Sequence, residues 1–295
     1  MTLHALAAAA LLLAVGVAQA GSSLPQGCDH QVAISAGQQD QLLRFAAVVR
    51  EALAASGARV ALISRSGTDL SRFGLRYSHA GIALAEGLDT PWAVRQLYYA
   101  CAEGAPRLFD QGLAGFVSGS DDANVGFIRV LLLPPEAAAP LAAATLDKPL
   151  ALGLLNARYS ANAYPFSADY QNCNQWVAEL IAAAIAGAST RAEAQAWLRR
   201  EGYAPQPVQA SAWLLLAGRF VPWLRFDDHP PDALNAGRVQ TSLPDSLDAL
   251  ALRLWPTARR LEFCHGSQGV VQREGGVPLA AGCAPQAGDR VTVLN

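Results

Sequence analysis

The chain has 295 residues, and its 22 Lys and Arg side chains nearly balance 24 Asp and Glu side chains, which gives a formal net charge of −2. This balance, without a run of like charges, gives no electrostatic case for nucleic acid as a partner. Hydrophobic residues make up 52% of the chain and charged residues 16%, which is typical of a globular protein. This length suffices for one large domain, or for a domain with an appendage.

The first twenty residues have the pattern of a signal peptide. An apolar run extends from Ala5 to Val17 and is followed by Ala18-Gln19-Ala20, the small-x-small pattern that precedes cleavage. The run is shorter than the roughly 20 helical residues that cross a bilayer, so we expect no permanent membrane span after cleavage. No Lys or Arg precedes the run, which leaves an uncleaved anchor as the alternative. We predict a signal peptide over residues 1–20 and a periplasmic or secreted mature protein.

The mature chain begins with a predicted helix and a predicted strand. Ser35 and Gln38 have the spacing of a capping box, and apolar residues at helical spacing follow until Gly57. Residues 58–64 form a short apolar run and are predicted to be a buried strand.

A hairpin is predicted next. Residues 78–84 and 92–100 are rich in β-branched and aromatic side chains, and residues 86–91 supply the turn between them. Another strand is expected over residues 125–133. The two prolines at 134 and 135 then open a short helix, because proline is tolerated in the first helical turn.

The strongest helical pattern begins after Asn172. Apolar residues recur on one face until Gly187, Asn172 is a good N-cap, and Gly187 is a typical helix stop. Cys173 therefore lies in the first turn of this helix. Thr190 and Glu193 have the capping spacing that predicts a further helix.

The C-terminal part becomes rich in proline and aspartate. Asp227, Asp228 and His229 are residue types that bind metals, but two prolines follow and no second cluster of ligands is evident. We therefore expect a solvated loop here and no metal or other cofactor. Short strand-like segments follow, which predicts a small β appendage over residues 236–295.

The cysteines are odd in number, and the five positions are Cys28, Cys101, Cys173, Cys264 and Cys283. In an oxidising compartment cysteines form disulfides, so an odd number leaves at least one free thiol. Cys264 and Cys283 flank a Gly-rich, strand-like segment and are the favoured bridge. Cys28 with Cys101 is the second bridge, and this elimination leaves Cys173 unpaired.

Cys173 is a candidate nucleophile. A thiol at a helix N-terminus lies near the positive end of the helix dipole and near unpaired backbone N–H groups, which favour thiolate and can also bind an oxyanion. His79, at the start of an apolar strand, is the best placed histidine to act as its base. The structural alternative for each residue is a small buried cysteine and a satisfied strand-edge histidine.

A strand that carries SHAGIAL, a second strand, and a helix that opens NCNQWV resemble the circularly permuted NlpC/P60 thiol hydrolases, which include lecithin retinol acyltransferase-like enzymes. The segments YSHAGIAL, LFDQGL (108–113) and YQNCNQWVAEL (170–180) more closely resemble DUF2145, an exported bacterial family of unknown function. This resemblance implies an α+β, permuted papain-like domain over residues 21–235, in which an antiparallel sheet packs on the helix that carries Cys173. It implies Cys173 as nucleophile and His79 as base.

The third catalytic residue follows from strand geometry. Members of the superfamily place a polar residue on the strand after the His strand to orient the imidazole. A turn near residue 88 places position 97 opposite His79, and the two-residue period then makes Gln96 or Tyr98 a neighbour, with Glu103 as a substitute. We choose Gln96. A Cys-His dyad, or an inactive site, is the alternative.

Together these features predict an exported cysteine hydrolase or acyl-transfer enzyme that acts on an amide or ester bond in the cell envelope. A peptide or glycopeptide of the cell wall is the first choice of substrate, and acyl groups of envelope lipids or proteins are the second. The alternative is a non-catalytic envelope protein that binds its ligand in the same groove. The enzyme hypothesis expects the Cys173 sulfur within about 4 Å of a His79 ring nitrogen.

Overall fold

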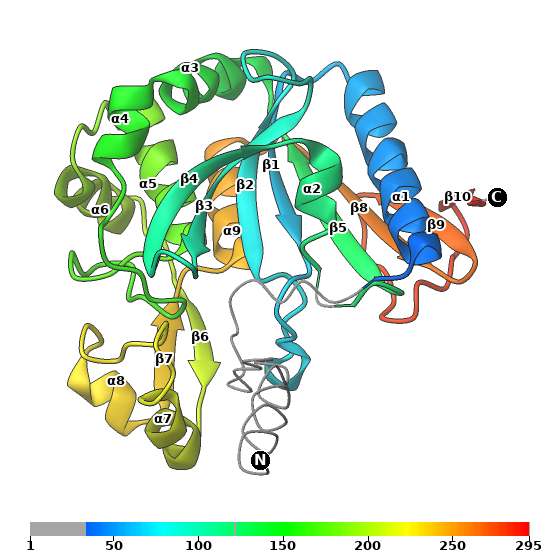
Figure 1. The fold of residues 1–295 in the computed structure, drawn as a ribbon. Coiled ribbons are helices and arrows are strands. Elements are labelled where there is room, and N and C mark those ends of the chain that lie inside the picture. The colour runs from blue at the N-terminus through cyan, green and yellow to red at the C-terminus, as the bar shows by residue number, and fades with distance from the viewer. Residues whose placement is uncertain (1–33, 121, 295) are drawn as a thin grey trace, which may run out of the picture.

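The computed structural model describes residues 34–120 and 122–294 and is built on an eight-stranded antiparallel sheet (Figure 1). The strands follow one another across the sheet in the order β10-β9-β8-β5-β1-β2-β3-β4. Their bounds are β1 Val60–Arg65, β2 His79–Leu84, β3 Ala93–Ala100, β4 Ala105–Gln111, β5 Gly126–Leu132, β8 Arg259–Gly266, β9 Gly269–Glu274 and β10 Arg290–Thr292. A mixed α+β fold with a large antiparallel sheet is thereby confirmed.

Helices cover both faces of the sheet, and alternate residues of β1 point into the two cores that these helices form. Ala61 and Ile63 join the core under one pair of helices, whereas Val60 and Leu62 join the core under the others. The first pair is α1 (Ala36–Ala55) and α2 (Leu113–Val117). The second group lies on the opposite face of the sheet (Figure 1). It comprises α3 (Pro135–Leu146), α4 (Lys148–Gly153), α5 (Cys173–Ala186), α6 (Arg191–Arg200) and α9 (Pro244–Leu254).

The predicted helix ends are confirmed where a capping side chain marks them. Ser35 and Gln38 form the reciprocal capping box of α1, and Thr190 begins α6 in the same way. Asn172 caps α5, which ends at Gly187 with a left-handed φ of 67°. Glycine adopts this conformation without the steric cost that a side chain adds.

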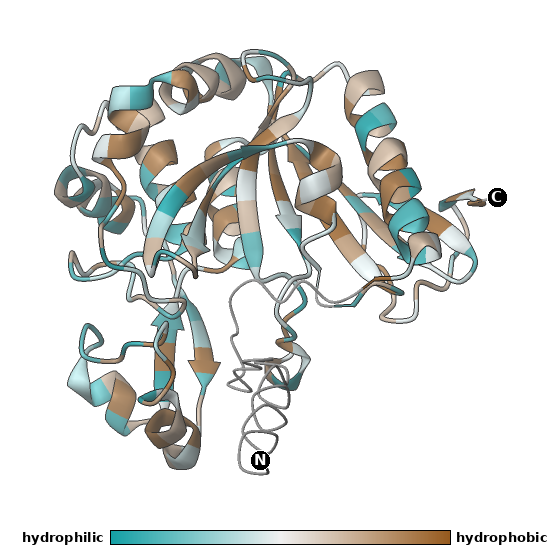
Figure 2. Ribbon diagram, viewed as in Figure 1, coloured by the Kyte–Doolittle hydropathy of each residue, from teal (hydrophilic) through white to brown (hydrophobic). Residues whose placement is uncertain are grey.

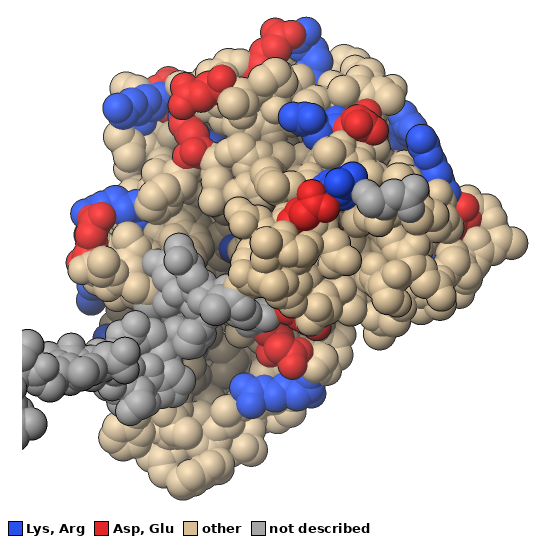
Figure 3. Space-filling model, turned by 45° about the vertical axis from the view of Figure 1, so that its right-hand side comes forward, with Lys and Arg blue, Asp and Glu red and all other residues tan. Residues whose placement is uncertain are grey.

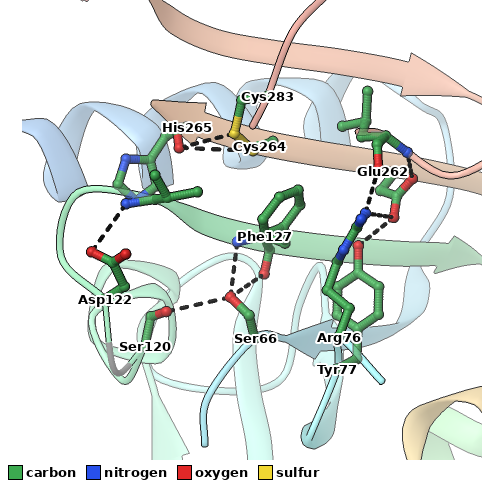
Figure 4. Close-up of a disulfide and its surroundings, with 12 residues drawn as sticks. Ser66, Arg76, Tyr77, Ser120, Asp122, Phe127, Glu262, Cys264, His265 and Cys283 are labelled. Atoms are coloured by element: carbon green, nitrogen blue, oxygen red, sulfur yellow. Dashed lines mark hydrogen bonds and ion pairs between the residues drawn. A yellow bond between two sulfur atoms is a disulfide. The ribbon is translucent and has the colours of Figure 1, made fainter. Parts of the chain in front are cut away.

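The C-terminal strands continue the main sheet, so they are not the separate appendage that the sequence predicted. β8 pairs with β5 along its whole length, and β9 and β10 extend the sheet beyond it. Without β8 the edge of β5 would leave a row of buried backbone groups unpaired, which is costly. The predicted Cys264–Cys283 disulfide is confirmed and links β8 to the segment that follows β9 (Figure 4).

Strand β8 also fixes the backbone that leads into β2. The Tyr77 hydroxyl donates a 2.5 Å hydrogen bond to Glu262 on β8, and Arg76 reaches the same carboxylate (Figure 4). Glu262 is buried, so these donors supply the partners that a desolvated carboxylate needs. The backbone just before His79 is therefore fixed to a strand far away in the sequence.

A small lobe lies outside the main sheet, between α6 and α9 in the chain. It contains a two-stranded sheet of β6 (Gln206–Gln209) and β7 (Arg238–Thr241), with α7 (Ala212–Gly218) and α8 (Pro231–Asn235). In Figure 1 the lobe projects below the sheet. Because the lobe spans position 236, the predicted boundary between domain and appendage falls within it.

The prediction of a solvated loop over Asp227 to His229 holds for Asp227, which is exposed, but not for the two residues after it. The side chains of Asp228 and His229 are fully buried, and Asp228 Oδ1 lies 2.7 Å from His229 Nδ1. The other oxygen of Asp228 accepts the Tyr164 backbone N–H at 2.8 Å. This buried pair connects the lobe to the segment before α5, and it replaces water as the partner of that N–H group.

Charges are scattered over the surface in small groups of both signs. Figure 3 shows blue and red side chains next to each other on the visible face, without a continuous patch of one sign. Across the described residues, no helix is both long enough and apolar enough to cross a membrane. The predicted signal peptide, residues 1–20, lies outside the described part of the chain.

Candidate active site

A cavity of about 570 Å³ lies where β1 ends and β2 begins, and it brings two of the predicted residues together. Cys173 and His79 both line it. Among the described residues, however, no hydrogen bond joins the Cys173 sulfur to the His79 ring, so the direct thiol–imidazole contact that the enzyme hypothesis expects is not formed here. Arg65, Tyr98 and Tyr159 also line it. Gln96, the third predicted residue, is buried and hydrogen-bonded to His79.

Cys173 is the first residue of α5, and its position is set by the asparagine on either side. Asn172 Oδ1 accepts the Gln175 N–H at 2.7 Å, while Asn172 Nδ2 donates to the Ser242 carbonyl at 3.0 Å. Asn174 Nδ2 donates to the Ser78 carbonyl at 3.0 Å, so the start of α5 is tied to the residue before His79. Sequence reasoning missed this role of Asn174, although the Asn-Cys-Asn triplet marked the place.

The thiol of Cys173 is free, and the residue is buried with 7% of its surface exposed. Burial raises the pKa of this thiol to about 11, although Arg65 and the backbone N–H groups of Asn174, Ala80 and Cys173 itself lower it. The helix N-terminus thus acts in the predicted direction, but the cost of desolvating the anion is larger. The resting site therefore holds a neutral thiol at pH 7 rather than the thiolate we expected.

His79 is fixed by Gln96. The Nε2 of His79 lies 2.5 Å from Gln96 Oε1, and Gln96 Nε2 donates in turn to Gln111 Oε1 at 2.6 Å. Because an amide oxygen only accepts, the proton of the neutral imidazole lies on Nε2 and leaves Nδ1 as the acceptor. Burial, and then the cation of Arg65, lower the pKa of His79 to about 3. The imidazole is therefore neutral at pH 7.

The strand register explains why Gln96 is this partner. Ile82 pairs with Arg95, so the same register continued places Gln96 opposite Gly81 and Tyr98 opposite His79. The prediction of position 97 was one residue short. A Cβ at Gly81 would lie 2.9 Å from the Arg95 carbonyl oxygen and 3.2 Å from Gln96 Cβ. Glycine here lets the Gln96 side chain come close to β2.

The other two candidates for the third residue lie differently. The ring of Tyr98 packs edge-on against His79, with 6.3 Å between the ring centroids. Glu103 is exposed and pairs with Arg107 at 2.6 Å. Gln96 is hydrogen-bonded to the imidazole.

Arg65 and Tyr159 are site residues that sequence reasoning missed. Arg65 pairs across β1 and β2 with His79, and its guanidinium lies 5.5 Å from the centre of the Phe116 ring. Its charge lowers the pKa of both His79 and Cys173. Burial raises the pKa of Tyr159, and the nearby Cys173 adds to this effect. An arginine directly after the apolar run 58–64 was the available signal for Arg65.

A family model described as "Uncharacterized protein conserved in bacteria (DUF2145)" matches residues 52–250. No curated protein and no solved structure matches the chain. Within the described residues, no group of three or more His, Cys, Asp and Glu side chains is arranged to hold a metal ion.

Proposed function

Because the chain belongs to the DUF2145 family of uncharacterized bacterial proteins, and the matched residues 52–250 include the whole site, we propose its function from that site. The protein is an exported cysteine hydrolase or acyl-transfer enzyme that acts on an amide or ester bond in the cell envelope. The observation that carries this proposal is the shared cavity of Cys173 and His79, with the imidazole oriented by Gln96.

The reaction starts from a neutral pair. Because burial disfavours both thiolate and imidazolium, His79 Nδ1 takes the thiol proton as the sulfur attacks the carbonyl carbon, rather than before. The C–S bond forms, and the carbonyl electrons move onto oxygen. Backbone N–H groups at the start of α5 stabilise this oxyanion. Gln96 Oε1 accepts a hydrogen bond from His79 Nε2–H throughout and stabilises the imidazolium.

The intermediate then collapses. The bond to the leaving nitrogen or oxygen breaks, and that atom takes the proton from His79, which leaves a thioester on Cys173. Water, or another acceptor, attacks the thioester with His79 again as base. No step uses a cofactor.

The order of elements in the chain supports the fold that we propose, and a disulfide supports the location. The His strand precedes the Cys helix in the chain, and α5 packs directly on β2 and β3, as a permuted papain-like domain requires. The Cys264–Cys283 disulfide fits an oxidising compartment such as the periplasm. The proposed class of reaction still rests on the site, because a fold alone does not fix an activity.

The test is to trap the thioester. Wild-type protein is mixed with p-nitrophenyl acetate, quenched in acid and analysed by mass spectrometry, and we expect one acetyl group on the peptide that contains Cys173. Cys173→Ser retains the shape of the site and should show no thioester. If folded wild-type protein forms no adduct on Cys173, the enzyme proposal fails. The competing candidate, a binding protein, is favoured by the low exposure of Cys173, 7%.

The shifted pKa values of Cys173 and His79 predict how thiol alkylation and ester hydrolysis depend on pH. Alkylation of Cys173 by iodoacetamide needs thiolate, so its rate should rise about tenfold per pH unit from 7 to 9.5 without a plateau, because burial raises the thiol pKa to about 11. Ester hydrolysis should not fall between pH 7 and 5, because burial lowers the pKa of His79 to about 3. A plateau below pH 9, or an acid limb near 6.5, would contradict the neutral resting pair.

A further inference from the structure

The cavity beside Cys173 has a wall made of hydrocarbon, and the small lobe supplies it. The lobe residues that line the cavity are Val208, Ala210, Leu214, Leu215, Trp223, Leu224, Phe226, Val239 and Thr241. Among these described residues there is no charged side chain. Such a wall stabilises a ligand by removing apolar surface from water and offers few partners for polar groups.

We propose that this cavity binds the hydrocarbon chain of an acyl substrate whose carbonyl lies at Cys173, which rests on the function proposed above. A cavity of about 570 Å³ is in the range that encloses most of a small ligand. Polar lining residues such as Arg65, Ser78 and Asn162 lie outside this wall, so a peptide bound against the wall itself would lose water from its N–H and C=O groups with few partners in return, which is costly. An alkyl chain has no such groups, and each buried methylene contributes about 0.8 kcal/mol.

The outer side of the same lobe indicates where such a substrate comes from. Trp213, Leu216 and Phe220 are 75%, 48% and 82% exposed, on and just after α7. The same helix contributes Leu214 and Leu215 to the cavity lining, so α7 is apolar toward both the cavity and solvent. The brown colour of α7 in Figure 2 reflects this hydrophobic composition.

This exposed apolar patch is suited to a lipid surface. Exposed aromatic and leucine side chains on a short helix insert at the boundary between headgroups and acyl chains, and the exposed Arg219 beside them suits anionic headgroups. The continuity of α7 from this patch to the cavity favours an acyl group taken from a membrane lipid or lipoprotein over a soluble peptide.

The first test measures binding without turnover. Cys173→Ala protein is titrated calorimetrically with octanoate, decanoate and dodecanoate, and we expect the affinity to rise about fourfold for each added methylene. Affinity that does not change with chain length, or tighter binding of N-acetyl-Phe-Leu-amide than of dodecanoate, would overturn the proposal. Because this variant cannot form a thioester, the result is independent of the acetyl trapping that judges the reaction.

Two neighbouring residues on β6 supply matched variants. Val208 lines the cavity and Gln209 is exposed on the other face of the strand. In the Cys173→Ala background, Val208→Glu should weaken dodecanoate binding at least tenfold, whereas Gln209→Glu adds the same charge and should leave binding unchanged. Equal binding by the two variants, both verified as folded by circular dichroism, would place the chain elsewhere and refute this site.

Vesicle sedimentation tests separately whether the exposed apolar patch binds a membrane. Wild-type protein should sediment with vesicles of phosphatidylcholine and phosphatidylglycerol, and Trp213→Ser/Phe220→Ser should lose at least tenfold in vesicle affinity while it retains dodecanoate binding. Vesicle binding that persists in the double variant, or is absent in wild type, would refute the membrane as the source of the acyl group.

Discussion

Replacing His79 with alanine is expected to lower the rate of Cys173 acylation by about 10²- to 10⁴-fold, the usual contribution of a positioned general base. The loss should be this large because burial keeps the thiol protonated at neutral pH, so little thiolate exists without a base. The burst of p-nitrophenolate on mixing with p-nitrophenyl acetate measures this rate. A His79→Ala rate within threefold of wild type would contradict the assigned role.

Gln96 provides a finer test of the same arrangement. Gln96→Ala removes the acceptor at His79 Nε2 and should lower the acylation rate less than the loss of the imidazole does. Gln96→Glu keeps an acceptor but adds a negative charge beside the ring, which raises the pKa of His79 and should shift the acid limb of the rate to higher pH. Glu103→Ala is the matched control, because Glu103 is exposed and pairs with Arg107 instead.

Local signals are the reason that much of this site was predictable. The Asn172 cap and the Gly187 stop mark α5, so Cys173 could be placed at its N-terminus. Position 96 was named from a predicted register that is one residue off. A shift of one residue exchanges the two faces of a strand, so a register with position 97 opposite His79 would put Gln96 on the other face of the sheet. The observed register, continued from the pair Ile82 and Arg95, puts Gln96 on the same face as His79. The free thiol followed from counting cysteines, and Cys101 is disulfide-bonded while its predicted partner Cys28 lies outside the described residues.

Long-range packing explains what sequence reasoning missed. The pairing of β5 with β8 joins residues more than one hundred positions apart, and neither strand carries a signal for the other. The apolar wall of the cavity comes from a lobe without a strong periodic pattern. The protonation states of Cys173 and His79 were also beyond reach, because they depend on burial, which only the assembled fold determines.

The largest loss of stability is expected at Glu179. This carboxylate is fully buried in α5 and accepts hydrogen bonds from Gln171 Nε2 at 2.5 Å, Gln195 Nε2 at 3.0 Å and Arg191 Nε at 3.0 Å. Glu179→Ala leaves these donors, including the mostly buried Arg191 cation, without their shared acceptor, which should cost about 3–5 kcal/mol in the free energy of unfolding. Urea denaturation followed by circular dichroism measures this change. Glu86→Ala, which removes an ion pair exposed to solvent, should scarcely move the midpoint.

The double variant Glu179→Met/Arg191→Met separates two causes of this loss of stability: an uncompensated charge on Arg191 and a broken network of glutamine hydrogen bonds. If the single variant is unstable because it leaves Arg191 uncompensated, replacing both members by apolar side chains of similar size should recover most of the stability. Recovery would mean that the ion pair is not needed for the fold itself. Its use would then lie in fixing Gln171, two residues before Cys173, and the double variant should still acylate Cys173 more slowly than wild type. A double variant as unstable as Glu179→Ala would instead show that the network of glutamines, rather than the charge on Arg191, holds α5 in place.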